Sequence, residues 1–384
     1  MKNELFYKGF FGLERETLRV DSSGKLAQTP HPFGDDEQIT RDFCENQIEL
    51  ITPVCRSVKE ALRELGRLDE RARRELEKRG ERIWLYSNPP HFESEDEIPV
   101  ANFTGEHSGK RAYRELLERR YGKRLMLFSG IHFNFSFDDE YLRTLCDESD
   151  FKKWRDGFYL RLYKQLSVHS WLLLLLTASS PYHDRSLWED GANGVVRSRY
   201  SSIRNSEKGY WNEFIPALDT STLGGFVESI KDYVRKGALF SASELYLPVR
   251  LKPKGINHID NFSEGISHIE LRMFDLDPAA PLGTDERDMG FAHLLIMYLS
   301  QQEDFDFTAQ LQEKAVLDHR KAALYDLSAV TIDGLPILER AKQILDGMRS
   351  FFAEDSFAAE IIGYEESKLR SRPCERIRAE EIYG

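Results

Sequence analysis

The stretch GLERETLRV at residues 12–20 has the alternation of a β-strand and carries two glutamates on one of its faces. Successive side chains of a strand point to opposite faces, so Glu14 and Glu16 share a face. The opposite face receives Leu13, Arg15 and Thr17. Two neighbouring carboxylates repel each other, so we expect a cation over this strand and further segments that contribute to the same site.

Three further segments repeat this combination of a polar face and an apolar face. They are ENQIELI at residues 45–51, LMLFSGIHFNFSF at 125–137 and ISHIELRMFDLD at 266–277. Their polar faces carry, in chain order, Glu45, Gln47, Glu49, His132, Asn134, Ser136, His268, Glu270 and Arg272. One such strand is ordinary in a half-exposed sheet, whereas four indicate a single sheet with a polar concave face. Carboxylate oxygens in this number favour Mg²⁺ or Mn²⁺ as the cation.

Helical periodicity predicts the layer that covers these strands. Residues 57–80 begin with a capping-box pattern and repeat apolar side chains at helical spacing, so they should form an amphipathic helix on the back of the sheet. Residues 151–180 are predicted to be a long apolar core helix, and helices are expected again beyond Thr284. Residues 244–250 are predicted to form another strand.

The composition excludes several kinds of partner. The net charge of −12 argues against nucleic acid and against an anionic membrane. The four cysteines show neither CxxC pairs nor zinc spacing, which is typical of a reducing compartment. The first ten residues lack a long apolar run, so no signal peptide is expected, and the longest apolar run, at residues 171–176, falls far short of the ~20 residues that span a bilayer. We therefore expect a cytoplasmic protein whose partners are small molecules.

Common nucleotide-binding and hydrolase motifs do not occur in the sequence. There is no GxxxxGK[ST] loop and no GxGxxG after a predicted strand, so a nucleotide would not be held by a P-loop or a Rossmann turn. There is also no nucleophile-elbow motif of a Ser–His–Asp hydrolase.

Several segments resemble bacterial glutamate–cysteine ligase, in the order of that family and spread over about residues 5–290. They are GLERETLR at 12–19, DF at 42–43 with ELITP at 49–53, YRE at 113–115 with YG at 121–122, SGIHFNF at 129–135, SIRNS at 202–206 with GY at 209–210, ELY at 244–246 and IELR at 269–272. The resemblance implies an α+β fold related to glutamine synthetase, with a curved, mainly antiparallel sheet, a polar concave active-site face and helices on the apolar back. From the length and the pattern of the chain we expect one catalytic domain over residues 1–384, with a sheet-forming core at about 5–290 and a mostly helical C-terminal part at about 291–384.

The reaction implied by the resemblance is the ATP-dependent ligation of glutamate to cysteine through γ-glutamyl phosphate, the first step of glutathione synthesis. Such chemistry needs divalent cations at the phosphates and an arginine that neutralises developing charge. The metal ligands implied by the resemblance are Glu14, Glu16, Asp42, Glu49, His132 and Glu270. The resemblance also implies catalytic roles for Glu270, for Arg272 at the transferring phosphoryl group and for Arg204 at the substrate carboxylate. The nucleotide would contact Arg272 and Asn134.

The positions matching the family's amino-acid pocket are Phe43, Tyr113, Leu117, Met126, Arg204, Tyr210 and Tyr246. Tyr113 and Leu117 stand at i and i+4 of a predicted helix at residues 110–121, so they share a face that could equally serve packing. Met126 stands where the proteobacterial form is expected to have glutamine, which makes this wall softer and more apolar.

Two alternatives to a glutamate–cysteine ligase stay open at this point. One is a related ligase that uses another amine or another acid, and the other is an inactive binding homologue. An inactive homologue would lack some metal carboxylates, and the sequence shows no such gap. The oligomeric state cannot be read from the sequence.

Overall fold

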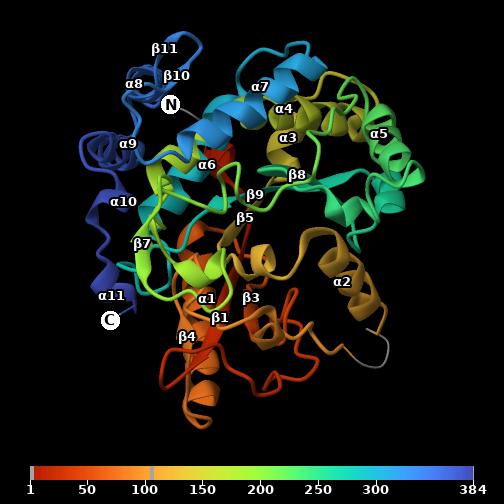
Figure 1. Cartoon of the computed structure of the whole chain (residues 1–384). Helices are drawn as coiled ribbons and strands as arrows, with labels where there is room; N and C mark the ends of the chain where they lie inside the picture. The colour runs from red at the N-terminus through yellow and green to blue at the C-terminus, as the bar shows by residue number, and fades with distance from the viewer. Residues whose placement is uncertain (1–3, 104–107, 384) are drawn as a thin grey trace.

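A seven-stranded sheet runs through the centre of the molecule (Figure 1), seen in a computed structural model that describes residues 4–103 and 108–383. Six strands follow one another in the order β2-β3-β1-β5-β9-β8, and β4 pairs with the C-terminal end of β1. Every pairing in this open sheet is antiparallel. The strands are β1 (Gly9–Asp21), β2 (Ile39–Thr40), β3 (Gln47–Ile51), β4 (Glu81–Trp84), β5 (Ile131–Phe137), β8 (Val249–Pro253) and β9 (Ile266–Phe274).

Strand β1 pairs with β3, β4 and β5, and it therefore sets the register of the sheet. Glu14 lies opposite His132 of β5 and Ile51 of β3, and Glu16 lies opposite Glu49 of β3. Residues directly opposite each other in an antiparallel pair project to the same face. The polar residues of segments far apart in the sequence consequently gather on one face.

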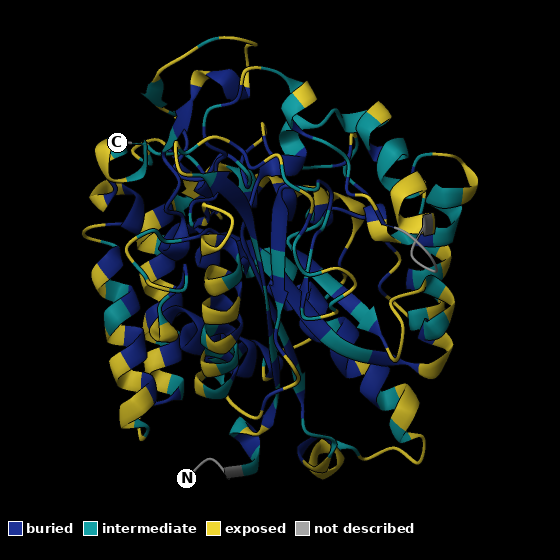
Figure 2. Cartoon of the chain, turned by 90° about the horizontal axis from the view of Figure 1, so that it is seen from below, coloured by how far each residue is buried: buried dark blue, intermediate teal, exposed yellow. Residues whose placement is uncertain are grey.

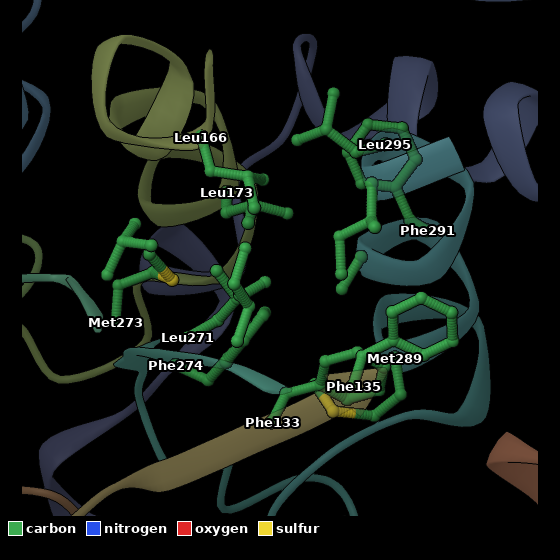
Figure 3. Close-up of a cluster of buried hydrophobic side chains, with 14 of the residues drawn as sticks. Phe133, Phe135, Leu166, Leu173, Leu271, Met273, Phe274, Met289, Phe291 and Leu295 are labelled. Atoms are coloured by element: carbon green, nitrogen blue, oxygen red, sulfur yellow. The ribbon is translucent and has the colours of Figure 1, made fainter. Parts of the chain in front are cut away.

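The other face of the sheet is apolar and packs against three helices. These are α1 (Val58–Glu77), α4 (Phe151–Thr177) and α6 (Glu286–Ser300). Figure 3 shows Phe133 and Phe135 of β5 and Leu271 of β9 among the side chains of α4 and α6, in one buried cluster. Removal of this apolar surface from water is the main driving force for the two-layer arrangement.

The remaining helices surround this core, and their outer faces are exposed while the central strands are buried (Figure 2). They are α2 (Ser108–Tyr121), α3 (Asp139–Leu145), α5 (Leu223–Arg235), α7 (Ala309–Ala322), α8 (Ile337–Phe351), α9 (Ser356–Lys368), α10 (Pro373–Arg376) and α11 (Ala379–Tyr383). Two small strand pairs lie outside the main sheet: β6 (Tyr182–Asp184) with β7 (Val195–Arg197), and β10 (Thr331–Ile332) with β11 (Leu335–Pro336). Within the described ranges, no helix has both the length and the apolar character needed to cross a bilayer.

The predicted α+β class, with a mainly antiparallel sheet and helices on its apolar back, is confirmed. The helix predicted at residues 57–80 is α1, and the hydroxyl of Ser57 caps it by accepting from the backbone N–H of Glu60 at 3.1 Å. The strand predicted at residues 244–250 is wrong, because a 3₁₀ turn, η6 (Ala242–Glu244), begins this segment and β8 starts only at Val249. Pro248 has no N–H to donate to a ladder, which accounts for the later start.

The imidazole of His319 on α7 is fully buried, and its removal from water lowers its pKa to about 3. Because the folded state holds this ring neutral, protons bind the unfolded chain preferentially below a pH of about 6.5. We expect this residue to cost about 2 kcal/mol of the unfolding free energy between about pH 7.5 and about pH 5. Urea unfolding at both pH values should show that the unfolding free energy of His319→Gln falls less on acidification than that of the wild type. The control is His258→Gln, which replaces an exposed ring and should show the same decrease in unfolding free energy as the wild type. The same decrease in His319→Gln as in the wild type would contradict the prediction.

Candidate active site

The polar face of the sheet brings carboxylates and an imidazole together at its centre. The Nδ1 atom of His132 lies 3.2 Å from Oε2 of Glu14 and 3.8 Å from Oε1 of Glu270. Its Nε2 atom lies 3.6 Å from Oε1 of Glu16. Ligand atoms of Glu14, His132 and Glu270 all lie within 4.8 Å of one another, a spacing that could hold one metal ion. Asn134 donates to Oε1 of Glu14 at 3.1 Å.

Three cations surround Glu270, whose side chain is fully buried. The Nζ atom of Lys252 lies 3.1 Å from one carboxylate oxygen, and a terminal nitrogen of Arg272 lies 3.2 Å from the other. Arg250 is the strand partner of Glu270 on β8. Neither Arg250, the last residue of the strand expected at 244–250, nor Lys252, which lies beyond that strand, is among the site residues expected from the sequence. The alternation VRLKP at residues 249–253, with two cations on one face, was the available signal.

Charge divides the carboxylates into two groups. Burial raises the pKa of Glu270, but the neighbouring Lys252 and Arg272 outweigh it and hold that pKa well below its usual range. For Glu14, the hydrogen bond from His132 likewise overcomes the effect of burial and lowers the pKa. Burial raises the pKa of Glu16 and the negative charge of Asp42 adds to the rise.

Glu49 is a second carboxylate of this cluster whose pKa is raised. Burial and the repulsion of Asp42, Glu14 and Glu16 hold its pKa well above the usual range. An added cation would relieve this repulsion.

The unpaired atoms of the cluster fit a divalent cation. Both carboxylate oxygens of Glu270 face cations at ion-pair distances, yet neither they nor Nε2 of His132 have an aligned hydrogen-bond partner within residues 4–103 and 108–383. Buried polar atoms without partners are costly unless something else satisfies them. Carboxylate oxygens with one imidazole suit Mg²⁺ or Mn²⁺.

A cavity of about 70 Å³ opens beside this cluster. Glu16, Asp42 and Arg272 line it, and the half-exposed side chain of Asp42 pairs with Arg114 of α2. Arg204 also lines it, and its guanidinium donates to the backbone carbonyls of Arg272 and Phe274 at 3.0 and 3.1 Å.

Arg204 lies flat against Gly130, where any Cβ would stand 2.4 Å from the guanidinium carbon. A glycine is therefore required at residue 130 for this arginine to reach the cavity.

The residues predicted for the amino-acid pocket fall into two layers. Met126, Tyr210 and Tyr246 line the cavity directly, and the two tyrosine rings lie 4.0 Å apart between centroids. Behind them, an apolar cluster with Met126 contains Phe43, Tyr113 and Leu117. The structure thus places all of the predicted pocket residues at or behind one cavity.

A second, larger cavity of about 430 Å³ lies on the other side of the segment 246–250. Its walls come from α5, η6, β8 and the 3₁₀ helix η7 (Ile259–Glu264), and they are mostly apolar. Arg250 and Lys252 also border it, so the same cations that surround Glu270 stand at its edge.

A carboxylate-rich polar face on an antiparallel sheet backed by helices agrees with the class of ATP-dependent ligases that the sequence resemblance implies. Within that class, the chain belongs to the glutamate–cysteine ligase family, whose model matches residues 1–238. This confirms the resemblance on which the site residues were chosen, although the match does not by itself assign a role to any of them.

The relatives and solved structures agree with this family. The Clostridium perfringens protein named glutathione biosynthesis bifunctional protein GshAB is 34% identical over 369 residues, covering 90% of this chain and 47% of that protein. Its Listeria monocytogenes counterpart is 33% identical over 396 residues, covering 95% and 51%. The chain therefore spans about half the length of these curated relatives.

Two solved structures resemble the whole chain. A bifunctional glutathione synthetase from Pasteurella multocida has 26% identity and a TM-score of 0.84, covering 99% of this chain and 52% of the other. A glutamate–cysteine ligase from Francisella tularensis, solved with AMP, has 23% identity and a TM-score of 0.86, covering 96% of this chain and 84% of the other. At that identity the second similarity concerns the fold alone.

Proposed function

We propose that the protein joins the γ-carboxylate of glutamate to the amino group of cysteine, with ATP as the energy source, giving γ-glutamylcysteine, ADP and phosphate. The observation that carries this proposal is the cluster of Glu14, His132 and Glu270 beside Arg272, with a cavity on either side of the segment 246–250. Membership of the glutamate–cysteine ligase family supports this choice of substrates. The product would enter glutathione synthesis, the process for which the relatives are named.

The carboxylate cluster is the proposed metal site. Glu14, Glu16, His132 and Glu270 would be its inner ligands, and Glu49 and Asp42 would add negative charge at its edge. Mg²⁺ or Mn²⁺, when bound, would neutralise the charge of the ATP phosphates. Lys252 and Arg272 form ion pairs with Glu270 and offset part of the carboxylate charge. Because both lie beside the proposed metal site, their positive charges would also attract the ATP phosphates.

Two arginines have distinct proposed tasks in forming γ-glutamyl phosphate. Arg272 lies within 3.4 Å of His132 and faces the cavity, so its guanidinium would bind the phosphoryl group in transfer from ATP to glutamate. Arg204 donates to two backbone carbonyls and lies 3.8 Å from the carboxylate of Asp275. Its other N–H groups, which have no hydrogen-bond acceptor among the described residues, would orient a substrate carboxylate. The amine of the acceptor then displaces phosphate from the acyl carbon.

The larger cavity is the proposed adenosine site. Its apolar walls suit a purine, and Arg250 and Lys252 lie where the phosphates would leave it toward the cluster. Asn134, whose Oδ1 has no hydrogen-bond partner among the described residues, would face the nucleotide from β5.

Filling this cavity should weaken ATP selectively. We expect Ala242→Trp, at the cavity wall, to raise the KM for ATP at least about 10-fold and to leave the KM for glutamate nearly unchanged. Initial-rate kinetics with each substrate varied in turn would measure both constants. Ala359→Trp on the exposed side of α9 is the matched control and should change neither. Equal increases for ATP and glutamate would place the nucleotide elsewhere.

The proposed acceptor site is the smaller cavity, whose walls include Met126, Tyr210 and Tyr246. A volume of about 70 Å³ suits a small amino acid, and the apolar wall at Met126 suits the thiol of cysteine. The same wall also fits other small amines, so a related ligase with a different acceptor is the second candidate.

The decisive experiment measures ATP-dependent phosphate release with glutamate plus each of a panel of amines, with mass spectrometry of the products. Cysteine should give the highest kcat/KM and a product with the mass of γ-glutamylcysteine. A higher value for another amine would keep the ligase chemistry and replace the acceptor. Absence of release with every amine would contradict the proposal.

We further propose a single domain in the cytoplasm. One buried cluster includes Phe6 near the start of the described chain and Ile362 on α9, which supports one domain over residues 1–384. The four cysteines are free, and three of them are buried, in keeping with a reducing compartment.

A further inference from the structure

Gln47, at the start of β3, connects two walls of the smaller cavity. Its side chain is buried, with only 2% exposed. Its Oε1 atom accepts from the backbone N–H groups of Phe43 and Cys44 at 2.7 and 2.9 Å. Its Nε2 atom donates to the backbone carbonyl of Met126 at 2.7 Å. A single carboxamide therefore joins the turn before β3 to the 3₁₀ helix η4 (Arg124–Leu127).

The three bonds specify a carboxamide and its orientation. Two N–H groups need an acceptor on one side, and a carbonyl needs a donor on the other side. Only an amide with Oε1 toward Phe43 and Nε2 toward Met126 satisfies all three groups. Without it, backbone groups in a buried place would lose their partners, which is costly.

The hydrogen bonds of Gln47, and not its position on the strand, separate it from the proposed metal ligands. It lies two residues before Glu49, so both side chains leave the same face of β3. Both ends of its amide are nevertheless occupied by backbone groups, whereas the carboxylate of Glu49 faces other carboxylates.

The two segments that Gln47 connects bear directly on the cavity. Asp42, next to Phe43, and Met126 both line it together with Glu16 and Arg272. The distance between these two walls sets the width available to an amine that attacks the acyl group. We infer that Gln47 is a positioning residue for the amine acceptor, which it serves by fixing Met126 relative to the turn at residues 42–44. This inference rests on the proposed function.

The test variant is Gln47→Glu, which keeps an acceptor for the two N–H groups and places a carboxylate oxygen against the carbonyl of Met126. Loss of that bond should displace the Met126 wall. The expected result is a roughly 10- to 100-fold increase in the KM for cysteine, with the KM for ATP and for glutamate within about 2-fold of the wild type. The rise in melting temperature produced by cysteine, which needs no turnover, should shrink in parallel.

Gln312→Glu is the matched control. Gln312 is also buried and also binds three backbone groups, the N–H and carbonyl of Leu218 and the carbonyl of Phe307, all at 2.8 Å. It does not line the smaller cavity. Both variants should melt at lower temperature, whereas only the Gln47 variant should change the KM for cysteine. If Gln47→Glu does not fold, Gln47→Met removes the bond to Met126 together with the two bonds from Phe43 and Cys44, without a buried charge.

An unchanged KM for cysteine and an unchanged thermal response to cysteine in both Gln47 variants would overturn the inference. So would an equal rise in the three KM values, or an equal effect in Gln312→Glu. Failure of the proposed function would give a different result, because the wild-type protein itself would then release no phosphate with any amine. The thermal response to cysteine still reports on Gln47 in that case.

Discussion

Glu16→Gln is expected to lower ligase activity at least ~100-fold and to leave the metal-free protein no less stable than the wild type. Burial of Glu16 and the negative charge of its neighbour Asp42 both raise the pKa of Glu16. The negative charge of Glu16 is therefore unfavourable before a cation binds. An amide of the same shape removes this repulsion. It also removes a charge that would help to hold Mg²⁺ near His132, 3.6 Å away. The substitution should therefore preserve or raise the stability of the metal-free protein while it lowers ligase activity.

The measurement pairs turnover over a range of Mg²⁺ concentrations with urea unfolding in EDTA. The control is Glu45→Gln, since the Glu45 carboxylate accepts from the backbone N–H groups of His31 and Asn102 at 2.8 and 2.7 Å and lies outside the cluster. That variant should lose stability and keep most of its activity. Near-wild-type turnover of Glu16→Gln at saturating Mg²⁺ would show that this carboxylate is not needed for the proposed metal site.

The polar sheet face could be predicted because it depends on local periodicity. The alternation within residues 9–21, 47–51, 131–137 and 266–274 determines which side chains share a face, whatever the order of the strands. The strand expected over residues 125–137 is wrong in its first part, which begins with the 3₁₀ helix η4. Strand order and register then follow from pairings that no single segment encodes. The resemblance to a known family supplied the grouping that periodicity alone leaves open.

Other features could not be read from the chain, because they depend on contacts between distant segments. Arg15 was expected on the apolar face, and it does lie there, yet it is fully buried because Asp69 of α1 forms an ion pair with it. A charged residue at that position is tolerated only where such a partner is supplied. Gln47 likewise had a predicted face, but its bond to Met126, 79 residues away, required the fold.

Lys252 shows how a boundary error hides a functional residue. The segment 244–250 has strand-forming side chains, so the strand was expected to end before this lysine. Pro248 instead delays the strand, and the register then sets Arg250 opposite Glu270, with Lys252 reaching the same carboxylate. The site accordingly carries two more cations than its sequence motif suggested.

Arg272→Lys is the second change for which we expect a loss of at least ~100-fold, here in kcat. Arg272 and Glu270 leave the same face of β9, and their side chains meet at 3.2 Å. The guanidinium also lies 3.4 Å from Nδ1 of His132, so one planar group is held between the carboxylate cluster and the cavity. Lysine keeps the charge but loses the fork of donors that fits a phosphoryl group. The KM for the amine should stay nearly unchanged.

The matched control for this change is Arg155→Lys. Arg155 is also largely buried and paired with a carboxylate, that of Asp139 at 2.8 Å, but it lies outside both cavities. Its substitution should lower the melting temperature and leave kcat within about 2-fold of the wild type. A comparable loss of kcat in both variants would mean that the effect of Arg272→Lys is structural.

Positional isotope exchange separates the two chemical steps that Arg272 could serve. With glutamate present and no amine, reversible formation of γ-glutamyl phosphate and ADP scrambles ¹⁸O between the bridging and non-bridging positions of ATP. If the arginine acts on the transferring phosphoryl group, this exchange should slow in Arg272→Lys by the same factor as kcat, because both then report the same step. Exchange at the wild-type rate with slow net ligation would instead assign Arg272 to the attack of the amine. Since Arg272 is the residue that joins the cluster around Glu270 to the smaller cavity, that outcome would move the phosphoryl-binding task to Lys252 and Arg250, at the edge of the larger cavity.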